Sequence, residues 1–371
     1  MRFNGGSLSN LHAKPLYYEQ LRWVSLRVLA SFPSWQAVGD SITGSAVPKR
    51  ANFPLTMKKT AVVTGSEGFI GSHMVKFLQA GGWNVIGTYL QEGGVPFPKL
   101  SRLQFVQCDL RNGQRITQLL AKYQPTHIFH LGAQSLPTVS WADPVKTFES
   151  NIMGSLHLFE AIRYHKRPPV VVSACSSAEY GPVAPSAMPV KEEHPLRPLH
   201  PYGISKVCQD LLAREYFLDY RIPAVNIRLF NTTGAGKTND APSDFVQQLV
   251  RIKKGLQSPV LEVGNLKPFR AFLDVNDTVR GFYLAAMKGK RGEVYNLCAT
   301  RTHSIDDILR RAIQLSGVKV EVRPVARLMR PSDEKIIFGS TEKIRRDTGW
   351  KPVHSLDHTL NSMLEYWQSV L

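Results

Sequence analysis

Cysteine is scarce in this chain of 371 residues, and its four copies are scattered along it: Cys108, Cys175, Cys208 and Cys298. These separations exclude the paired spacing of a zinc site, and they do not resemble the closely spaced set of a secreted disulfide framework. We therefore expect no metal site and no disulfides. A reducing compartment, the cytoplasm, is the expected location.

Long apolar runs are missing from the N-terminal leader, residues 1–56. The leader is basic and poor in acids, and its longest apolar stretches are interrupted by Arg27 and Pro33. Because a membrane span needs about 20 apolar residues in succession, we expect none there. Met57 directly precedes the first expected strand, as a natural start would, so we expect the leader to be disordered or an over-extended reading of the gene. A targeting peptide is the alternative.

A dense basic stripe is also lacking, although the formal net charge is +17. Lys and Arg occur as scattered pairs, such as Lys253-Lys254 and Arg310-Arg311, and aromatic residues are not interleaved with them. A nucleic-acid groove needs clustered cations and stacking rings, so we expect neither a nucleic-acid nor a membrane partner. The charge fits an enzyme that handles anionic substrates.

Short β-branched runs alternate with helical periodicity from Thr60 onward, and 43% hydrophobic residues can fill a sizeable core. This succession predicts an α/β fold, a Rossmann-type doubly wound parallel sheet with helices on both faces. Strands are expected at 60–64, 84–88, 103–107, 127–131, 170–174 and 224–228, and helices at 72–80, 115–123, 148–165 and 202–220.

The regular alternation ends at Gly236, which predicts a smaller C-terminal α/β lobe. We expect a strand at 260–263 and helices at 244–254, 275–288, 304–316 and 355–370. The chain is thus divided into the leader, a sheet domain at 57–236 and a mainly substrate-binding lobe at 237–371, from which some segments return to the sheet domain. A lobe over the carboxyl ends of the strands would complete a substrate pocket.

Three glycines, Gly65, Gly68 and Gly71, lie between the first expected strand and helix. In this context glycine lets the backbone approach a pyrophosphate, and the helix N-terminus supplies N–H donors. The spacing Gly-x-x-Gly-x-x-Gly differs from the standard Gly-x-Gly-x-x-Gly. We expect NAD or NADP to bind the sheet domain at this turn.

The residues at the end of the second strand do not distinguish NAD from NADP. An acid there would bind the ribose 2′-hydroxyl of NAD, and an arginine would bind the 2′-phosphate of NADP. The chain has neither residue type there, because its sequence is Thr88-Tyr89-Leu90-Gln91. Asp109, after the third strand, is a candidate for the adenine edge and equally for a helix cap.

Tyr202 and Lys206 stand four residues apart on an expected helix, so both project from one face. A free tyrosine titrates near pH 10, and a nearby ammonium lowers its pKa by stabilising the phenolate. Ser177, after the strand 170–174, is placed to hold a reacting oxygen beside Tyr202. These three residues predict a proton-transfer site that works with hydride transfer.

Several segments together resemble the extended short-chain dehydrogenases that act on nucleotide sugars, and the resemblance covers Met57 to the C-terminus. They are 65–71, Leu131-Gly132-Ala133-Gln134, Ser176-Ser177-Ala178-Glu179-Tyr180-Gly181, 201–206, Arg228-Leu229-Phe230-Asn231 and 272–277. Within that family the chain is most similar to the GDP-hexose branch of GDP-4-keto-6-deoxymannose reductases and GDP-mannose 4,6-dehydratases.

The resemblance implies a role for particular residues. Catalysis would use Ser177, Tyr202, Lys206 and, in a dehydratase, Glu179. The cofactor would contact Gly65, Gly68, Phe69, Ile70, Gly71, Asp109, Leu110, Leu131, Ala133, Tyr202 and Lys206. The nucleotide sugar, a GDP-hexose, would contact Gln134, Asn231, Asn265, Arg270 and Arg330.

The chain departs from its relatives at two places. Ala271 follows Arg270 where relatives commonly carry an acid, and Glu179 directly precedes Tyr180 where many have a residue between them. We prefer the 4-reductase, which needs only a hydride and one proton. A 4,6-dehydratase, which needs a carboxylate facing the sugar, and a 4-epimerase remain alternatives.

Two further expectations concern assembly and activity. Relatives pair through two long helices, so a homodimer through 148–165 and 202–220 is expected by analogy. A member that uses its dinucleotide site only for binding is the distant alternative, which intact Ser177, Tyr202 and Lys206 argue against.

Overall fold

The computed structural model describes residues 59–90, 102–329 and 336–371. Their largest sheet has seven strands in the order β11-β6-β5-β4-β1-β2-β3, and every neighbouring pair is parallel. The strands are β1 (Thr60–Thr64), β2 (Asn84–Tyr89), β3 (Leu103–Gln107), β4 (His127–His130), β5 (Val170–Ser176), β6 (Ala224–Leu229) and β11 (Val294–Leu297).

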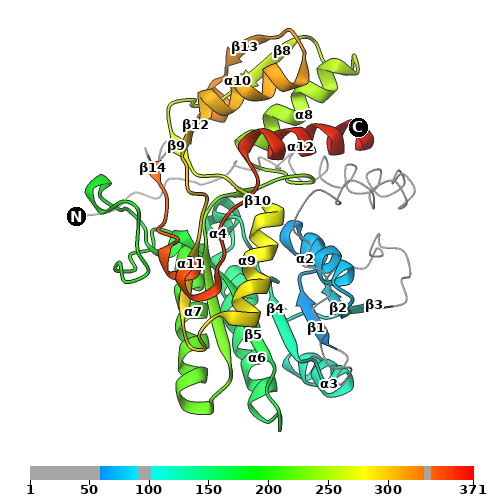
Figure 1. Cartoon of the computed structure of the whole chain (residues 1–371), viewed down its shortest axis with the longest axis vertical. Coiled ribbons are helices and arrows are strands. Elements are labelled where there is room, and N and C mark those ends of the chain that lie inside the picture. Colours follow the sequence, from blue (N-terminus) through cyan, green and yellow to red (C-terminus); the bar gives the residue numbers. More distant parts are fainter. Residues whose placement is uncertain (1–58, 91–101, 330–335) are drawn as a thin grey trace, which may run out of the picture. The chain divides into compact units, whose positions relative to one another are not determined.

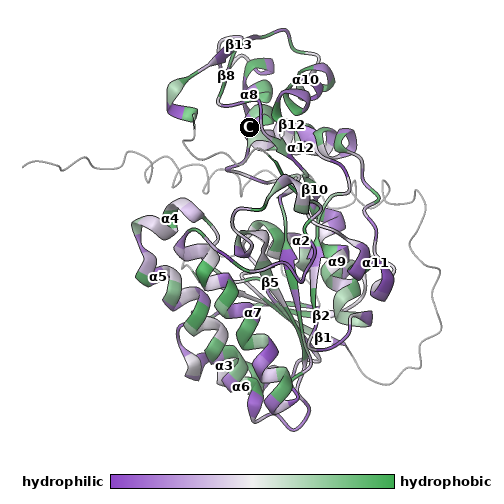
Figure 2. Cartoon of the chain, turned by 90° about the vertical axis from the view of Figure 1, so that its left-hand side faces the viewer, coloured by the Kyte–Doolittle hydropathy of each residue, from purple (hydrophilic) through white to green (hydrophobic). Residues whose placement is uncertain are grey.

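Helices cover both faces of this sheet, as Figures 1 and 2 show. One face carries α2 (Phe69–Ala80) and α9 (Val275–Lys288), and the other carries α3 (Gly113–Tyr123), α6 (Gly154–Arg163) and α7 (Pro201–Tyr220). Side chains alternate between the faces along each strand. In β1, Ala61 and Val63 enter the core under α2, while Val62 enters the core under α3.

The remaining elements are short or lie late in the chain. Between β4 and α7 lie α4 (Pro137–Ala142), α5 (Pro144–Phe148), the π-helical turn η2 (Glu149–Met153) and the 3₁₀ turns η3 (Ser177–Glu179) and η4 (Pro185–Ala187). After β6 come β7 (Thr232–Thr233), α8 (Ala241–Lys253), β8 (Val260–Val263), β9 (Phe269–Arg270), β10 (Leu273–Asp274), β12 (His303–Ser304), α10 (Ile305–Ser316), β13 (Glu321–Pro324), η5 (Ala326–Leu328), β14 (Ile336–Ile337), α11 (Glu342–Thr348) and α12 (Leu356–Val370).

The late segments form small sheets and a helical group. β8 pairs with β13, β7 with β10, and β9 with both β12 and β14. Helices α8 and α10 pack together beside β8, at the top of Figure 1.

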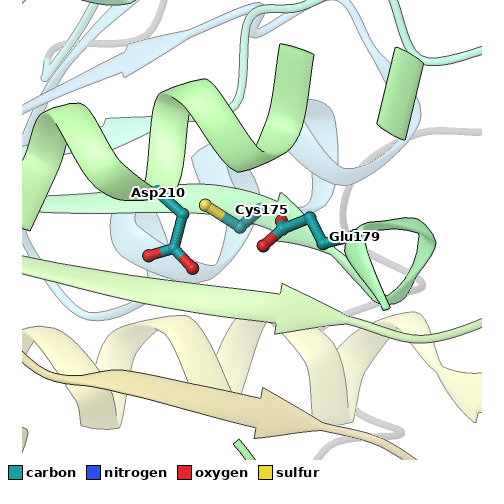
Figure 3. Close-up of side chains that lie close together, drawn as sticks. All are labelled: Cys175, Glu179 and Asp210. Carbon is teal, nitrogen blue, oxygen red and sulfur yellow. The ribbon is translucent and has the colours of Figure 1, made fainter. Parts of the chain in front are cut away.

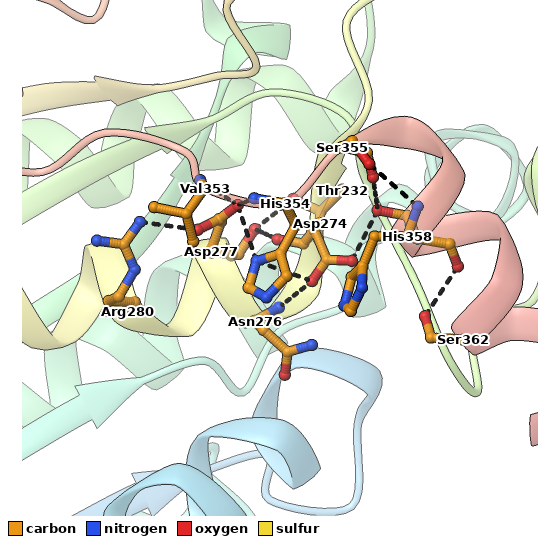
Figure 4. Close-up of polar contacts among 12 residues, drawn as sticks. Thr232, Asp274, Asn276, Asp277, Arg280, Val353, His354, Ser355, His358 and Ser362 are labelled. Carbon is orange, nitrogen blue, oxygen red and sulfur yellow. Dashed lines mark hydrogen bonds and ion pairs between the residues drawn. The ribbon is translucent and has the colours of Figure 1, made fainter. Parts of the chain in front are cut away.

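A polar network joins the start of α9 to the chain that enters α12 (Figure 4). The Asp277 carboxylate accepts the backbone N–H groups of Val353 and His354, each at 2.9 Å. The Thr359 hydroxyl donates to Asp274 at 2.7 Å. Asp277 also raises the pKa of His354 above its usual value. These bonds hold α12 against the sheet layer through α9.

The predicted Rossmann-type fold is confirmed. Two details differ from the sequence expectation. The helix expected at 148–165 is interrupted by η2, and no strand was expected at β11, which comes from the part after Gly236 and forms an edge of the main sheet. The leader lies outside the described residues. Among the described ranges, no helix combines the length and apolarity needed to cross a bilayer.

Candidate active site

The glycine turn between β1 and α2 is closely packed against the end of β4. Gly65 has φ +64, and a Cβ there would lie 2.7 Å from the Gly132 Cα. A Cβ on Gly71 would collide with the Gly65 carbonyl oxygen. Side chains are therefore excluded at Gly65 and Gly71, as expected where the backbone of a turn approaches a phosphate group.

The N-terminus of α2 is available for an anion. Gly68 is the N-cap and offers no side-chain cap, and the first turn, which begins with Phe69 and Ile70, contains no acid. The first N–H groups of a helix have no partner within the helix, and the helix dipole favours a negative charge there. The turn thus fits the pyrophosphate of a dinucleotide.

A buried chain of hydrogen bonds fixes the segment after β4. The Thr64 hydroxyl oxygen accepts the N–H groups of Leu131 and Gly132 at 3.0 and 2.9 Å, and it lies 3.0 Å from His130 Nδ1. Burial lowers the pKa of His130 to about 3, so the ring is neutral and its Nδ1 can accept the Thr64 proton. Its Nε2 then donates to Ser155 Oγ at 3.0 Å.

Asn151, in the π-helical turn η2, holds the other end of this segment. Its side chain accepts the Gln134 N–H at 2.8 Å and donates to the Gln134 carbonyl at 2.9 Å and to Ser205 at 2.9 Å. It therefore links Leu131, Ala133 and Gln134 to α7. The Gln134 side chain, an expected substrate contact, donates to the Leu136 carbonyl in its own loop and to Thr147 Oγ1 of α5.

Asp109 and Leu110 lie directly after β3, as expected of residues near an adenine. Asp109 is bound by the backbone and guanidinium of Arg111, which lowers the pKa of the carboxyl. It does not cap α3, whose N-cap is Asn112. Leu110 packs close to Gly132.

Tyr202 and Lys206 lie on the first turns of α7, which His200 caps by accepting the Gly203 N–H at 3.0 Å. The Lys206 ammonium is buried, lies 5.9 Å from the centre of the Tyr202 ring, and donates to the Ala174 carbonyl at 2.7 Å and Gln209 Oε1 at 2.8 Å. Two of its three donors are engaged, so one remains for a ligand.

The expected lowering of the Tyr202 pKa by Lys206 is not found. Burial raises the pKa of Tyr202 to about 12, and Ser176 is the group that lowers it, through a side-chain hydrogen bond. Burial also lowers the pKa of Lys206. The ammonium is held by its hydrogen bonds to Ala174 and Gln209.

Ser176, the neighbour of the expected Ser177, is the serine whose side chain lowers the pKa of Tyr202. Ser176 ends β5 and is the N-cap of η3, where its side chain accepts the Ala178 N–H at 3.2 Å. Ser177 is the first residue of that 3₁₀ turn. Sequence reasoning missed Ser176, although Ser176-x-x-Glu179 has the pattern of a capping box, which places Ser176 at the turn's N-terminus.

Glu179 is 0% exposed and lies behind the turn, not at an open surface. Its carboxylate accepts the Ser176 N–H at 2.7 Å and the Arg228 Nε–H at 3.0 Å. Arg228 also binds Asp210 at 2.6 Å. Burial and the neighbouring Asp210 raise the pKa of Glu179 to about 8.

Cys175 of β5, Glu179 of η3 and Asp210 of α7 lie close together, as Figure 3 shows, with one candidate metal-ligand atom each within 4.8 Å of the others. The Arg228 guanidinium binds both carboxylates and supplies the compensating positive charge. Burial also raises the pKa of the Cys175 thiol well above its usual value, which disfavours the thiolate that a metal needs. The cluster is an ion-pair core.

The expected substrate contacts lie on segments after β6. Asn231 follows β6, and its carbonyl accepts the Leu273 N–H at 2.9 Å. Asn265 lies between β8 and β9 and accepts the Lys267 N–H at 3.1 Å, and Arg270 lies in β9. Arg330 lies outside the described residues.

Comparisons with known proteins identify the family of the chain. A family model described as GDP-mannose 4,6 dehydratase matches residues 62–363. A GDP-6-deoxy-D-mannose reductase of Pseudomonas aeruginosa is 28% identical over 84% of this chain and 98% of its own length. A solved structure of RMD from Pseudomonas aeruginosa complexed with NADPH has a TM-score of 0.74 and 26% identity, and covers 84% of this chain and 100% of that chain.

A second solved structure, Thermus thermophilus UDP-glucose 4-epimerase complexed with NAD, has a TM-score of 0.73 and 27% identity, and covers 84% of this chain and 100% of that chain. The resemblance predicted from the sequence is confirmed. The chain belongs to the GDP-mannose 4,6-dehydratase family of the extended short-chain dehydrogenases, and it is an enzyme of that nucleotide-sugar family.

Proposed function

We propose that this enzyme reduces the 4-keto group of a GDP-6-deoxyhexose, with a reduced nicotinamide dinucleotide as the hydride donor. The observation that carries the proposal is the position of Tyr202, whose pKa the Ser176 side chain lowers, on the same helix as the buried Lys206. This arrangement supplies a proton donor for a ketone oxygen. The reductase and the NADPH complex from Pseudomonas aeruginosa support both the reaction and the coenzyme class.

The residues would act as follows. The bound dinucleotide supplies a hydride, with its electron pair, to the sugar C4. Tyr202 gives its hydroxyl proton to the oxygen that becomes the C4 alcohol, and it is reprotonated from solvent. The Ser176 hydroxyl holds that oxygen beside Tyr202, and Lys206 uses its remaining donor to orient the dinucleotide.

Glu179 is a positioning residue in this proposal. Elimination of water from the sugar needs a carboxylate that can reach the C5 proton. The carboxylate of Glu179 already accepts hydrogen bonds from Ser176 and Arg228. The dehydratases that this chain resembles place their base two residues after the catalytic serine, a position that is Glu179 if Ser177 is that serine and Ala178 if Ser176 is. These facts favour reduction over 4,6-dehydration.

The proposed enzyme is a homodimer that pairs through α6 and α7. Ile204, Leu211 and Leu218 on α7 are 42%, 55% and 49% exposed. They are spaced seven residues apart, which puts them on one stripe of the helix. An exposed apolar stripe of this kind on a long helix is typical of a helix-packing interface.

The assay measures the absorbance of reduced nicotinamide on mixing with GDP-4-keto-6-deoxymannose, with NADH and NADPH in parallel. We expect oxidation of the coenzyme and formation of a 4-hydroxy product, and a loss of at least about a hundredfold in kcat for Tyr202→Phe. Absence of oxidation with either coenzyme would contradict the reductase. Accumulation of a 4-keto product from GDP-mannose without net coenzyme turnover would establish the dehydratase instead, and interconversion of UDP-glucose and UDP-galactose the epimerase.

A further inference from the structure

Glu67 lies within the glycine turn, and its side chain reaches the carboxyl end of β2. Its Oε1 accepts the N–H of Leu90, the first residue after the strand, at 3.0 Å. Ser66 ties the same turn to the strand, because its N–H and its hydroxyl both donate to the Thr88 carbonyl, at 2.9 and 2.8 Å. The glycine turn and the end of β2 are therefore joined by hydrogen bonds. Residues 66–67 and 88–90 form one edge of the domain, on which Glu67 is exposed.

This edge is where the adenosine ribose of a dinucleotide lies in a doubly wound fold, since the pyrophosphate lies at the adjoining helix N-terminus. In the usual arrangement an acid at the end of the second strand binds the ribose 2′-hydroxyl. Here Tyr89 and Leu90 occupy that end, and Glu67 brings a carboxylate to it from the glycine turn.

The Glu67 carboxylate has two oxygens, and the Leu90 N–H binds Oε1. The second oxygen can accept a hydrogen bond from a 2′-hydroxyl. A 2′-phosphate at the same place would bring like charges together, which disfavours binding.

Two arginines that follow β3, the strand beside β2, have partners of their own. Arg111 binds Asp109 with its guanidinium, and Arg115 donates its Nε–H to the Gln107 carbonyl at 3.3 Å. The Glu67 carboxylate can therefore accept a hydrogen bond from a 2′-hydroxyl, while Arg111 and Arg115 have other partners.

We propose that Glu67 makes this enzyme select NAD(H) over NADP(H), by binding the adenosine 2′-hydroxyl and repelling a 2′-phosphate. The inference rests on the proposed function only in requiring a nicotinamide dinucleotide at the glycine turn. It holds whichever sugar reaction the enzyme performs.

Coenzyme binding without sugar substrate tests the inference, measured as dissociation constants for NADH and NADPH from nicotinamide fluorescence. We expect the wild type to bind NADH at least about tenfold more tightly than NADPH. Glu67→Gln keeps an oxygen for the Leu90 N–H but removes the charge, and we expect it to reduce this preference by about tenfold, mainly through tighter NADPH binding. Arg115→Gln is the matched control and leaves the preference unchanged.

Equal or tighter binding of NADPH by the wild type would overturn the inference, as would an unchanged preference in Glu67→Gln. If that variant melts at a much lower temperature than the wild type, Glu67→Asp provides a second test. Its shorter side chain withdraws the carboxylate from the edge, so NADH should bind less tightly. Failure of the wild type to bind either dinucleotide would contradict the proposed function itself, whereas sugar reduction with an NADPH preference would refute only the role of Glu67.

Discussion

Two neighbouring serines give the active site a matched pair of variants. The Ser176 side chain lowers the pKa of Tyr202, whereas Ser177 begins the adjoining 3₁₀ turn. We expect Ser176→Ala to lower kcat for 4-keto reduction about a hundredfold, because it removes a donor to the developing alkoxide. It should also raise the pKa of Tyr202 further, which moves the pH dependence of hydride transfer upward. Ser177→Ala should remain within about twofold of the wild type.

Steady-state kinetics across pH distinguish the two serines. Equal losses in both variants, or a loss confined to Ser177→Ala, would contradict the placement of Ser176. A wild-type pH profile in Ser176→Ala together with a lowered kcat would show that the serine does not act on the tyrosine.

At this scale the sequence could predict the types of residue but not their geometry. Tyr202 and Lys206 were found because four residues are one helical turn. The sequence could not decide between Ser176 and Ser177, because neighbouring residues at a strand end point in different directions, and the direction depends on where the strand ends. Glu67 was overlooked as a ribose contact because the expected acid lies at the end of the second strand, whereas the structure brings one there from the turn.

Arg228 connects three elements, since from β6 it binds Glu179 of η3 and Asp210 of α7. The side chains of these three residues are at most 7% exposed. Arg228→Met would leave two buried carboxylates without their cation, and we expect it to lower the free energy of unfolding by about 3–5 kcal/mol near neutral pH. Arg323→Met, which breaks the exposed Arg323–Glu321 pair, should change it by less than about 1 kcal/mol.

The pH dependence of this loss follows from Glu179. Its pKa is raised from 4.5 to about 8 in the folded protein. Between these pH values the unfolded chain has lost a proton that the folded protein keeps, so the free energy of unfolding falls as the pH rises. Arg228 lowers the pKa of Glu179, so its removal should raise this pKa further, and the free energy of unfolding should then keep falling to a higher pH. Urea unfolding should therefore show a larger deficit for Arg228→Met at about pH 9 than at about pH 6. If Arg228→Met lowers the free energy of unfolding by the same amount at both pH values, the ion pairs of Arg228 do not account for the loss of stability.

Whole elements were more predictable than their interruptions. β1, β3, β8 and α9 have the bounds expected from periodicity, because each buries a regular pattern. The strands β9, β10, β12 and β14 have two residues each, too few to show a period. The π-helical turn η2 adds one residue within a helical pattern, and its reason is the buried Asn151, whose partners Gln134 and Ser205 lie on distant segments.

At the scale of the whole molecule, the apolar stripe on α7 predicts the assembly. Leu211 lies at its middle, between Ile204 and Leu218, and is more than half exposed in the single chain. We expect the wild type to have a mass about twice the 41.5 kDa of one chain. Leu211→Glu would bury a charge against its symmetry mate at such an interface, so the variant should be monomeric at micromolar concentrations.

Sedimentation velocity measures both masses directly. Leu256→Glu is the matched control, because Leu256 is 60% exposed in the turn after α8 and lies outside the stripe, so this variant should keep the wild-type mass. A monomeric wild type, or a dimer that survives Leu211→Glu, would contradict pairing through α7. Since α7 also carries Tyr202 and Lys206 at its start, loss of the dimer should lower the thermal stability of the site as well as the mass. The melting temperature should rise with protein concentration in the dimeric wild type, and it should not depend on concentration in monomeric Leu211→Glu.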